Sequence, residues 1–255
     1  MRNYMKVLAI GLLLAVFGVA SGNADNTTVN AVNDGNLQRY RSADVQPDDY
    51  YTTRNQTSSW TVENSTTAIH VGQTLAAGYY YIWRGFLAFP LNTLAGATAV
   101  ACTLYIDGAA NNSVTDFNLF AVYGKEYKPL LDIGDYDGFT GWATSGAYSP
   151  VYLSNALNTS SYSNGANGLI FTTAGKDSVH TAFGDTLWVA ILSYEDISNS
   201  APTDGEDVTF DGSADANKPY LSINYTPAGW SGTIGNLTNP AAVGAYSKSE
   251  IKEIR

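Results

Sequence analysis

Short runs of residues that alternate between apolar and polar recur through most of this sequence, with turn-forming residues between them. In the run VACTLYI, Cys102 and Leu104 belong to an apolar set that alternates with Thr103 and Tyr105. Because successive side chains of a strand point to opposite faces, a period of two predicts a strand with one apolar face. No segment of ten or more residues in the body of the chain shows a clear helical period. The expected strands are 58–64, 68–74, 79–89, 99–107, 116–124, 150–154, 168–173, 185–195, 207–210 and 219–226.

Clusters of Gly, Asn, Asp, Ser and Pro between the expected strands supply turn chemistry. Many short strands with turns between them predict an all-β chain that folds as a single jelly-roll-like β-sandwich. The region 58–226 contains no internal repeat and no linker, so we assign it to one domain. Residues 25–57 are polar and rich in Asn, Asp and Thr, which predicts an extended N-terminal arm, and residues 227–255 form a short C-terminal tail.

The first 24 residues have the three-part plan of a secretory signal peptide. Arg2 and Lys6 precede an uncharged run from Val7 to Ala20, and small and polar residues follow. The run has 14 residues, fewer than the roughly 20 that span a bilayer as a helix. We therefore expect cleavage after Ala24, no membrane span after processing, and a location outside the cell or on the surface of a cell or virus-like particle. A retained N-terminal helix that packs within an assembly is the alternative.

An excess of acidic residues limits the partners of the chain. Thirteen Lys and Arg stand against 23 Asp and Glu, which gives a net charge of −10 at pH 7. Nucleic-acid binding draws on Lys and Arg that neutralise phosphates, and an anionic membrane surface repels an acidic protein. We therefore expect neither nucleic acid nor a membrane surface as a partner.

Cys102 is the only cysteine, so no internal disulfide is possible and stability must come from the core. Its place on the apolar face of an expected strand favours a buried thiol over a nucleophile. The same alternation predicts a larger buried set, namely Val100, Cys102, Leu104, Ile106, Leu187, Val189, Ile191, Leu221 and Ile223.

The run YYYIWRGFLAF (79–89) is apolar on both faces, as in a strand that is covered on both sides. Arg84 is the lone charge in this run. If Arg84 is buried it requires a carboxylate or carbonyl partner, because an unpaired buried charge is strongly unfavourable.

Three segments resemble the DNRLRE-type, disaggregatase-related domain: WRGFLAFPLNTLAGATAVACTLYIDG, DTLWVAILSYED and KPYLSINYT. The resemblance covers roughly residues 65–226. It implies a β-sandwich and a link to the carbohydrate-binding modules of surface enzymes and to surface and virus-associated proteins. We expect no attached catalytic domain, and this sequence has Pro90 where the family has an acidic residue. The resemblance therefore implies the fold more strongly than it implies any ligand.

One acidic loop is a candidate calcium site. The segment LLDIGDYDGFTGW brings Asp132, Asp135 and Asp137 close together, and Gly138 permits a tight turn. Calcium prefers several carboxylate and carbonyl oxygens, which such a loop supplies. The alternative is that these are solvated turn residues, and the same alternative holds for the acids of the segment TDGEDVTFDGSAD (203–215).

No catalytic set is evident in the sequence. Glycoside hydrolysis needs two convergent carboxylates, which loop tips on a sandwich do not imply. His70 lies in an expected strand and His180 in an expected loop, and neither has ligands at zinc-binding spacing. No G-x-S-x-G motif is present. We therefore expect a protein that is not an enzyme and requires no cofactor, with calcium as the possible ion.

Exposed tryptophans are the candidates for stacking on sugar rings. Trp60 and Trp142 lie nearer loops and are the two candidates for exposure, whereas Trp83 and Trp188 lie mid-strand and are assigned to the core or to inter-strand packing. Trp230 is a further candidate. The alternative for all of them is structural packing, because aromatic residues are enriched in strands.

Seven N-x-S/T sequons would be surface sites in a host that glycosylates asparagine. They are Asn26, Asn55, Asn64, Asn111, Asn158, Asn224 and Asn236.

Two functions from different classes follow from these observations. The first is a structural protein that assembles with other copies of itself into a filament, fibre or coat, through strand donation from its terminal segments. The second is a glycan-binding module of a surface protein. Terminal arms docked on a neighbouring copy would favour the first, and a convergent row of exposed aromatic residues beside a calcium site would favour the second.

Overall fold

The computed structural model describes residues 24–40, 50–57, 60–64, 67–127, 130–228, 233–234 and 237–238. The chain divides into two compact units, one of residues 24–229 and one of the two chain ends. In the unit of chain ends, β13 (Thr233–Ile234) pairs with β14 (Leu237–Thr238). The expected signal peptide up to residue 23, Trp230 and Asn236 lie outside the described residues. No helix in the described part of the chain has the length and apolar character needed to cross a membrane.

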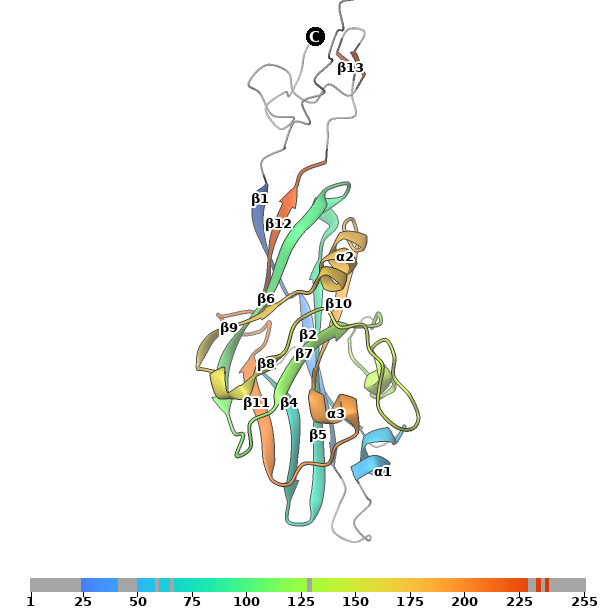
Figure 1. The fold of residues 1–255 in the computed structure, drawn as a ribbon, viewed down its shortest axis with the longest axis vertical. Helices are drawn as coiled ribbons and strands as arrows, with labels where there is room; N and C mark the ends of the chain where they lie inside the picture. The colour runs from blue at the N-terminus through green and yellow to red at the C-terminus, as the bar shows by residue number, and fades with distance from the viewer. Residues whose placement is uncertain are drawn as a thin grey trace, which may run out of the picture. The chain divides into compact units, whose positions relative to one another are not determined.

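Residues 24–229 fold around a twelve-stranded sheet, which confirms the all-β prediction (Figure 1). Its main path runs in the order β1-β12-β6-β11-β4-β5-β10-β7-β8, while β2 joins β5 and β3, and β9 joins β6. The narrower prediction of a jelly roll stays a prediction. The strands are β1 (Asp25–Asn30), β2 (Asn33–Tyr40), β3 (Trp60–Asn64), β4 (Ala68–Ala76), β5 (Tyr79–Pro90), β6 (Thr98–Asn111), β7 (Asn118–Tyr123), β8 (Leu157–Asn158), β9 (Gly165–Ile170), β10 (Thr186–Ser193), β11 (Gly205–Asp211) and β12 (Tyr220–Thr226).

Short helices fill the connections between these strands. Of the α-helices, α1 and α3 lie at the same side of the sheet and α2 lies beside β6 (Figure 1). The helices are α1 (Tyr50–Asn55), α2 (Thr173–Thr181), α3 (Tyr194–Ser198) and the 3₁₀ helices η1 (Asn92–Leu94), η2 (Ile133–Asp137) and η3 (Thr159–Ser161).

The sheet curls because β5 has two neighbours in succession along one edge. Its first part, Tyr79–Trp83, pairs with β4, and its second part, Gly85–Pro90, pairs with β10, while β2 runs along the other edge. Gly72 has a φ of +126°, a backbone conformation that favours glycine, and a Cβ atom there would collide with the carbonyl oxygen of Glu206 on the neighbouring β11. A Cβ atom at Gly85 would lie 2.9 Å from Cγ2 of Val71, so glycine at this position lets the two parts of the sheet approach.

Two hydrophobic clusters lie on opposite faces of β5. Leu87 and Phe89 point into the inner cluster, which also contains the apolar side chains of β4, β6, β10, β11 and β12. Ile82 and Phe86 point into the outer cluster, which α1, α3 and the long connection after β7 cover. This arrangement confirms that the strand is covered on both sides.

Residues 25–40 and 50–57 are not an arm outside the sandwich, so that prediction is wrong for the described residues. β2 pairs with β5 over eight residues, and its Leu37 is completely buried in the outer cluster. The polar side chains of β2 misled the prediction because they are buried with partners. Asp34 accepts hydrogen bonds from the backbone N–H and the hydroxyl of Ser213, and Asn36 accepts one from the N–H of His70.

Eight of the nine residues predicted to form the core are buried, and Val100 is the exception, with 47% of its surface exposed. The register between β12 and β6 shifts at this point, because Asn224 pairs with Ala101 and Tyr225 pairs with Ala99. Val100 is therefore the extra residue of a β-bulge, which turns its side chain to solvent. Cys102, two residues later, is 4% exposed as predicted.

His180 lies in α2 rather than in a loop, which corrects the sequence assignment. The helix begins at a cap, where the hydroxyl of Thr172 accepts a hydrogen bond from the N–H of Gly175. Its nine residues are too few to show a helical period in the sequence, and Val179 anchors it in the inner cluster.

Candidate functional site

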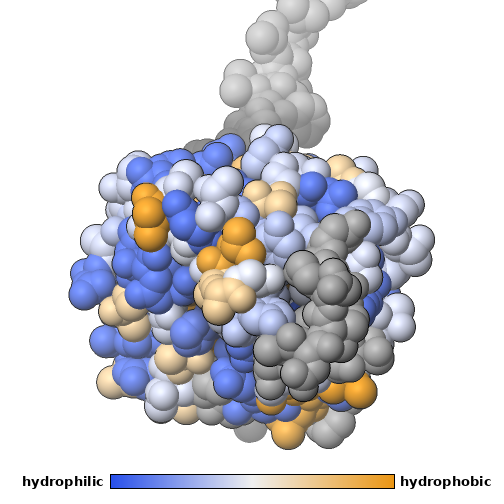
Figure 2. All heavy atoms as spheres, turned by 90° about the horizontal axis from the view of Figure 1, so that it is seen from below, coloured by the Kyte–Doolittle hydropathy of each residue, from blue (hydrophilic) through white to orange (hydrophobic). Residues whose placement is uncertain are grey.

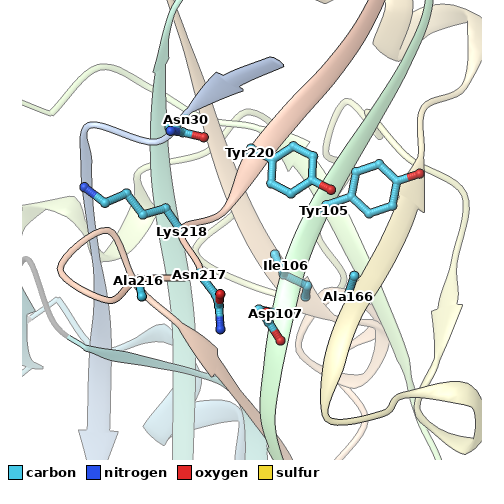
Figure 3. Close-up of a pocket in the computed structure, with 9 residues that line it drawn as sticks. All are labelled: Asn30, Tyr105, Ile106, Asp107, Ala166, Ala216, Asn217, Lys218 and Tyr220. Atoms are coloured by element: carbon cyan, nitrogen blue, oxygen red, sulfur yellow. The ribbon is translucent and has the colours of Figure 1, made fainter. Parts of the chain in front are cut away.

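A hollow of about 400 Å³ lies on the face of the sheet that points away from the inner cluster. Tyr105 of β6 and Tyr220 of β12 form its aromatic part (Figure 3). Both strands alternate at this point, since Leu104 and Leu221 are fully buried while the two tyrosines are half-buried. The remaining lining residues are Asn30, Ile106, Asp107, Ala166, Ala216, Asn217 and Lys218.

The two tyrosine rings form a step-like platform. Tyr105 and Tyr220 are cross-strand neighbours, their ring centroids are 5.0 Å apart, and the ring planes differ by 20°. Figure 3 shows both rings nearly face-on, so they present their faces in the same direction. On the next strand, Gly168 pairs with Tyr105, and a Cβ at Gly168 would lie 3.4 Å from that ring. Glycine at this position leaves the ring room to lie across the sheet.

Polar side chains of both charges surround the platform (Figure 3). Asn30, Asn217 and Lys218 are exposed, and Asp107 is half-buried. The pKa of the nearby Asp211 carboxyl is raised, first by burial and then by the charges of Asp215 and Asp107. The rim therefore combines acceptors on the Asp107 side with a cationic donor at Lys218 and two amides that both donate and accept.

Neither tryptophan predicted to stack on sugars lies in this hollow. Trp60 does not lie at the surface, because it is 4% exposed and its Nε1–H donates to the carbonyl oxygen of Gln56. It stacks on Tyr136, with ring centroids 6.2 Å apart, and lies over Arg84. Trp60 lies next to an expected loop in the sequence, but in the fold its side chain packs in the outer cluster.

Trp142 is half-buried and packs against the outer cluster. Its ring meets Tyr136 edge-on, with centroids 5.5 Å apart, and lies 6.4 Å from the ring of Tyr148. Of the two tryptophans assigned to the core, Trp188 is buried and Trp83 is half-buried. Sequence reasoning missed the tyrosine platform because it considered only tryptophans. The available signal was an aromatic residue on the polar face of an alternating strand.

The loop predicted to bind calcium uses its carboxylates in local structure. Asp132 caps η2 by accepting from the N–H of Gly134 at 2.6 Å, and Asp135 accepts from the N–H of Asp132 at 2.8 Å. Asp137 forms an ion pair with Lys125 at 3.2 Å. Within the described ranges, no group of three His, Cys, Asp or Glu side chains is placed to hold a metal ion. Calcium binding stays a prediction, and a lower melting temperature after chelation would support it.

Two glutamates from distant segments influence each other near the start of α3. Burial, the largest effect, raises the pKa of Glu195 to about 7, and the charges of Glu206 and Asp196 act in the same direction. Glu206 is buried and accepts a hydrogen bond from Nε2 of Gln73 at 3.0 Å. The sequence gives no sign of this pair, because the two residues meet only in the folded chain.

A buried charged cluster is formed by Arg54 of α1, Arg84 of β5 and Asp196 of α3. Nε of Arg84 is 2.7 Å from Oδ2 of Asp196, and Nε of Arg54 is 3.0 Å from Oδ1 of the same carboxylate. None of the three side chains is more than 1% exposed. The expectation that a buried Arg84 needs a carboxylate or carbonyl partner is confirmed, since it also donates to the carbonyl oxygen of Tyr136.

Aromatic rings enclose this cluster. The guanidinium of Arg54 lies 3.4 Å from the ring centroid of Tyr148, and that of Arg84 lies 4.8 Å from the ring centroid of Trp60. The Tyr148 hydroxyl accepts a hydrogen bond from Arg84. Because the three side chains are almost completely enclosed, we assign the cluster to joining α1, α3 and β5 rather than to binding.

The histidines and sequons have ordinary surroundings. Nδ1 of His70 is 3.5 Å from the hydroxyl of Thr209, and His180 is exposed beside Phe183. Four sequon asparagines take part in local structure: Asn55 donates to the Tyr51 carbonyl, Asn64 bonds the backbone of Leu131, Asn111 donates to the Thr159 carbonyl and Asn158 caps η3. Asn26 and Asn224 are cross-strand neighbours at the sheet edge. Glycosylation at these positions stays a prediction.

No protein-family model matches this chain, and no curated protein matches it significantly. The resemblance to the DNRLRE-type domain therefore remains an expectation from the sequence motifs.

Proposed function

We propose that this protein is a non-catalytic glycan-binding protein and that the tyrosine platform is its sugar site. One observation carries the proposal, namely the paired ring faces of Tyr105 and Tyr220 in a shallow hollow with a polar rim. The C–H bonds on one face of a pyranose ring carry a slight positive charge and pack against the negative face of an aromatic ring. The hydroxyl groups at the edge of the sugar require both donors and acceptors, which the rim offers.

The resemblance to a family linked with carbohydrate-binding modules supports the same function. The position of the hollow on an outer face of the sheet also supports this function, because a polymer chain can reach it from solvent. The rim has an anionic part at Asp107 and a cationic part at Lys218. Two residues with opposite charges suit a sugar with neutral hydroxyls better than a strongly acidic one, which Asp107 would repel. We propose a location outside the cell or on a cell or particle surface, in line with the N-terminal sequence.

Substitution of either tyrosine tests this function. Tyr220→Ala and Tyr105→Ala are expected to weaken binding to polysaccharides at least tenfold, about 1.4 kcal/mol, because the stacking surface is lost. Affinity electrophoresis with xylan, laminarin and galactomannan measures this effect. Tyr194→Ala is the matched control, since Tyr194 is 47% exposed and lies outside the hollow. Equal loss in the control, or no binding of the wild-type protein to any of these polymers, would contradict the proposal.

Self-assembly is the second candidate function. The N-terminal segment does not support it as a free arm, because its described part pairs within its own sheet. A different observation now favours it, because β1 stands at the end of the sheet with an open edge among the described residues.

A further inference from the structure

The open edge of β1 can be assigned residue by residue. The N–H of Ala31 donates to the carbonyl oxygen of Pro219 at 2.8 Å, so the backbone groups of Ala31 point toward β12. Backbone groups alternate in direction along a strand, and β1 pairs with β12 without a shift from Asp25 to Asn30. The N–H and C=O groups of Asn26, Thr28 and Asn30 therefore point away from β12. On this side the N–H of Val32 donates to the carbonyl oxygen of Ala88 in β5 at 3.0 Å, so the open part of the edge is Asn26 and Thr28.

This edge lacks the features that usually prevent edge-to-edge association. Proteins protect open edges with short strands, charged side chains, proline or bulges. At the opposite end of the sheet, β8 has two residues. In contrast, β1 has six residues, no proline, no register shift and a single charge at Asp25. Its sequence, DNTTVN, leaves the middle of the strand uncharged.

The face shown in Figure 2 offers no large apolar surface for association. The face of the molecule shown in Figure 2 is mostly hydrophilic, and its hydrophobic side chains lie in a few separate places. Hydrophobic residues that are scattered singly are normal for a soluble surface. The unpaired backbone groups of β1 offer directional contacts that such a surface does not.

We propose that a second copy of this chain pairs with the β1 edge, with the two β1 strands antiparallel across a two-fold axis. Such a contact is self-complementary, as closed dimers require. A two-fold axis between antiparallel strands is perpendicular to the sheet, so the same face of both copies lies on the same side. The dimer therefore carries two tyrosine platforms on one face, near the interface, since Asn30 of β1 lines the hollow.

The consequence for binding rests on the proposed glycan function, but the pairing does not. Two sites on one face can engage the same polymer or surface, which raises avidity without any new contact to the sugar. A single pair of six-residue strands buries less area than a standard interface, so the dimer is expected to be weak in dilute solution.

Proline at an outward-pointing position tests the pairing. Thr28→Pro removes one N–H from the open edge, and proline is tolerated at edge strands, so the fold is expected to persist. Sedimentation velocity over a hundredfold concentration range is expected to show a monomer–dimer equilibrium for the wild-type protein and for Thr28→Ala. It is expected to show at least tenfold weaker association for Thr28→Pro, with an unchanged circular dichroism spectrum. A wild-type protein that stays monomeric throughout, or equal association of Thr28→Pro and Thr28→Ala, would overturn the proposal.

Hydrogen exchange of the wild-type protein decides the question even if the proline variant does not fold. The amides of Asn26 and Thr28 are expected to gain protection as the protein concentration rises. The amides of Thr27 and Val29, which point toward β12, are expected to be protected at every concentration. Exchange at Asn26 and Thr28 that does not depend on concentration would refute the pairing, whatever the glycan assays show.

Discussion

Asp196 is the shared counter-charge of two buried arginines. It pairs with Arg54 and Arg84 at the same time, and all three side chains are almost completely excluded from water. Two guanidinium groups share one carboxylate, so the remaining donors are satisfied by carbonyl oxygens, including those of Gly146 and Tyr136. The pairing fixes the positions of α1 and α3 against β5.

Removal of the Asp196 charge is therefore expected to destabilise the fold strongly. Asp196→Asn leaves two buried arginines without a counter-charge, and the expected loss in the free energy of unfolding is about 3–5 kcal/mol. Urea denaturation measures this loss. The control is Asp177→Asn, since Asp177 is exposed on α2 and its substitution is expected to change stability by less than about 0.5 kcal/mol. Similar losses for both variants would show that the cluster is not the cause.

Glu195 predicts how stability depends on pH. Burial raises its pKa from 4.5 to about 7 in the folded chain. Between these values the folded chain holds the proton and the unfolded chain does not, so stability from this residue is lost as the pH rises. Glu195→Gln cannot lose a proton, so its melting temperature is expected to match the wild type near pH 4.5 and to exceed it at pH 8.

The effect at pH 8 is expected to be about 1–2 kcal/mol once solvent screening of the half-buried side chain is taken into account. Thermal melts of both proteins from pH 4.5 to pH 8 measure it. The exposed Glu63 provides the control, and Glu63→Gln is expected to follow the wild-type profile. A constant difference between Glu195→Gln and the wild type across this range would contradict the assignment.

At the level of strands, β6 shows how one extra residue, Val100, interrupts the alternation of buried and exposed side chains. Alternation from Cys102 to Ile106 is regular, and Leu104 is completely buried. The bulge before it turns Val100 outward, although the sequence alternates through this position without a break. The hydrophobic pattern alone therefore overestimates the length of the buried strand.

Substitutions on the two sides of the bulge are expected to differ in their effect. Val100→Ser is expected to change the free energy of unfolding by less than about 0.5 kcal/mol, because the side chain is 47% exposed. Leu104→Ala is expected to reduce it by about 2–5 kcal/mol, since it leaves a cavity in the inner cluster. Urea denaturation of both variants checks this difference, and a loss above about 2 kcal/mol for Val100→Ser would show that the bulge is absent in solution.

Strands with an apolar face were predictable from the sequence, whereas β1 and β2 were not. The runs that became β5, β6 and β10 bury apolar side chains, so their alternation is visible in the sequence. In β2, by contrast, Asp34 and Asn36 are buried because Ser213 and His70 come from other parts of the chain to meet them. β1 lies at the sheet edge and buries little, so it carries no apolar signal.

The candidate site was also only partly predictable. Tyr105 and Tyr220 each stand on the polar face of an expected strand, but they are 115 residues apart in the sequence. Their contact depends on the register between β6 and β12, which the sequence pattern does not specify. The Asp132 loop shows the opposite case, because its acidic residues are close in the sequence and their spacing serves a helix cap.

For the molecule as a whole, the proposed sugar site and the proposed contact between two copies lie on the same part of the sheet. The outer face of β1, β12, β6 and β9 contains the tyrosine platform, and β1 is the edge strand of this face. Pairing through that edge would extend the face across two copies and place both platforms toward the same surface. The net charge of −10 opposes close approach of two copies, so association is expected to strengthen as salt screens this repulsion.

The central claim is that the Tyr105 and Tyr220 rings contact sugar directly, and an NMR titration tests it most directly. Aromatic ¹³C-labelled protein would be titrated with an oligosaccharide of the polymer that binds best in affinity electrophoresis. The ring signals of Tyr105 and Tyr220 are expected to shift together and to saturate, while those of Tyr194 and Trp142 stay in place. Saturable shifts at other aromatic residues, with Tyr105 and Tyr220 unchanged, would contradict the claim.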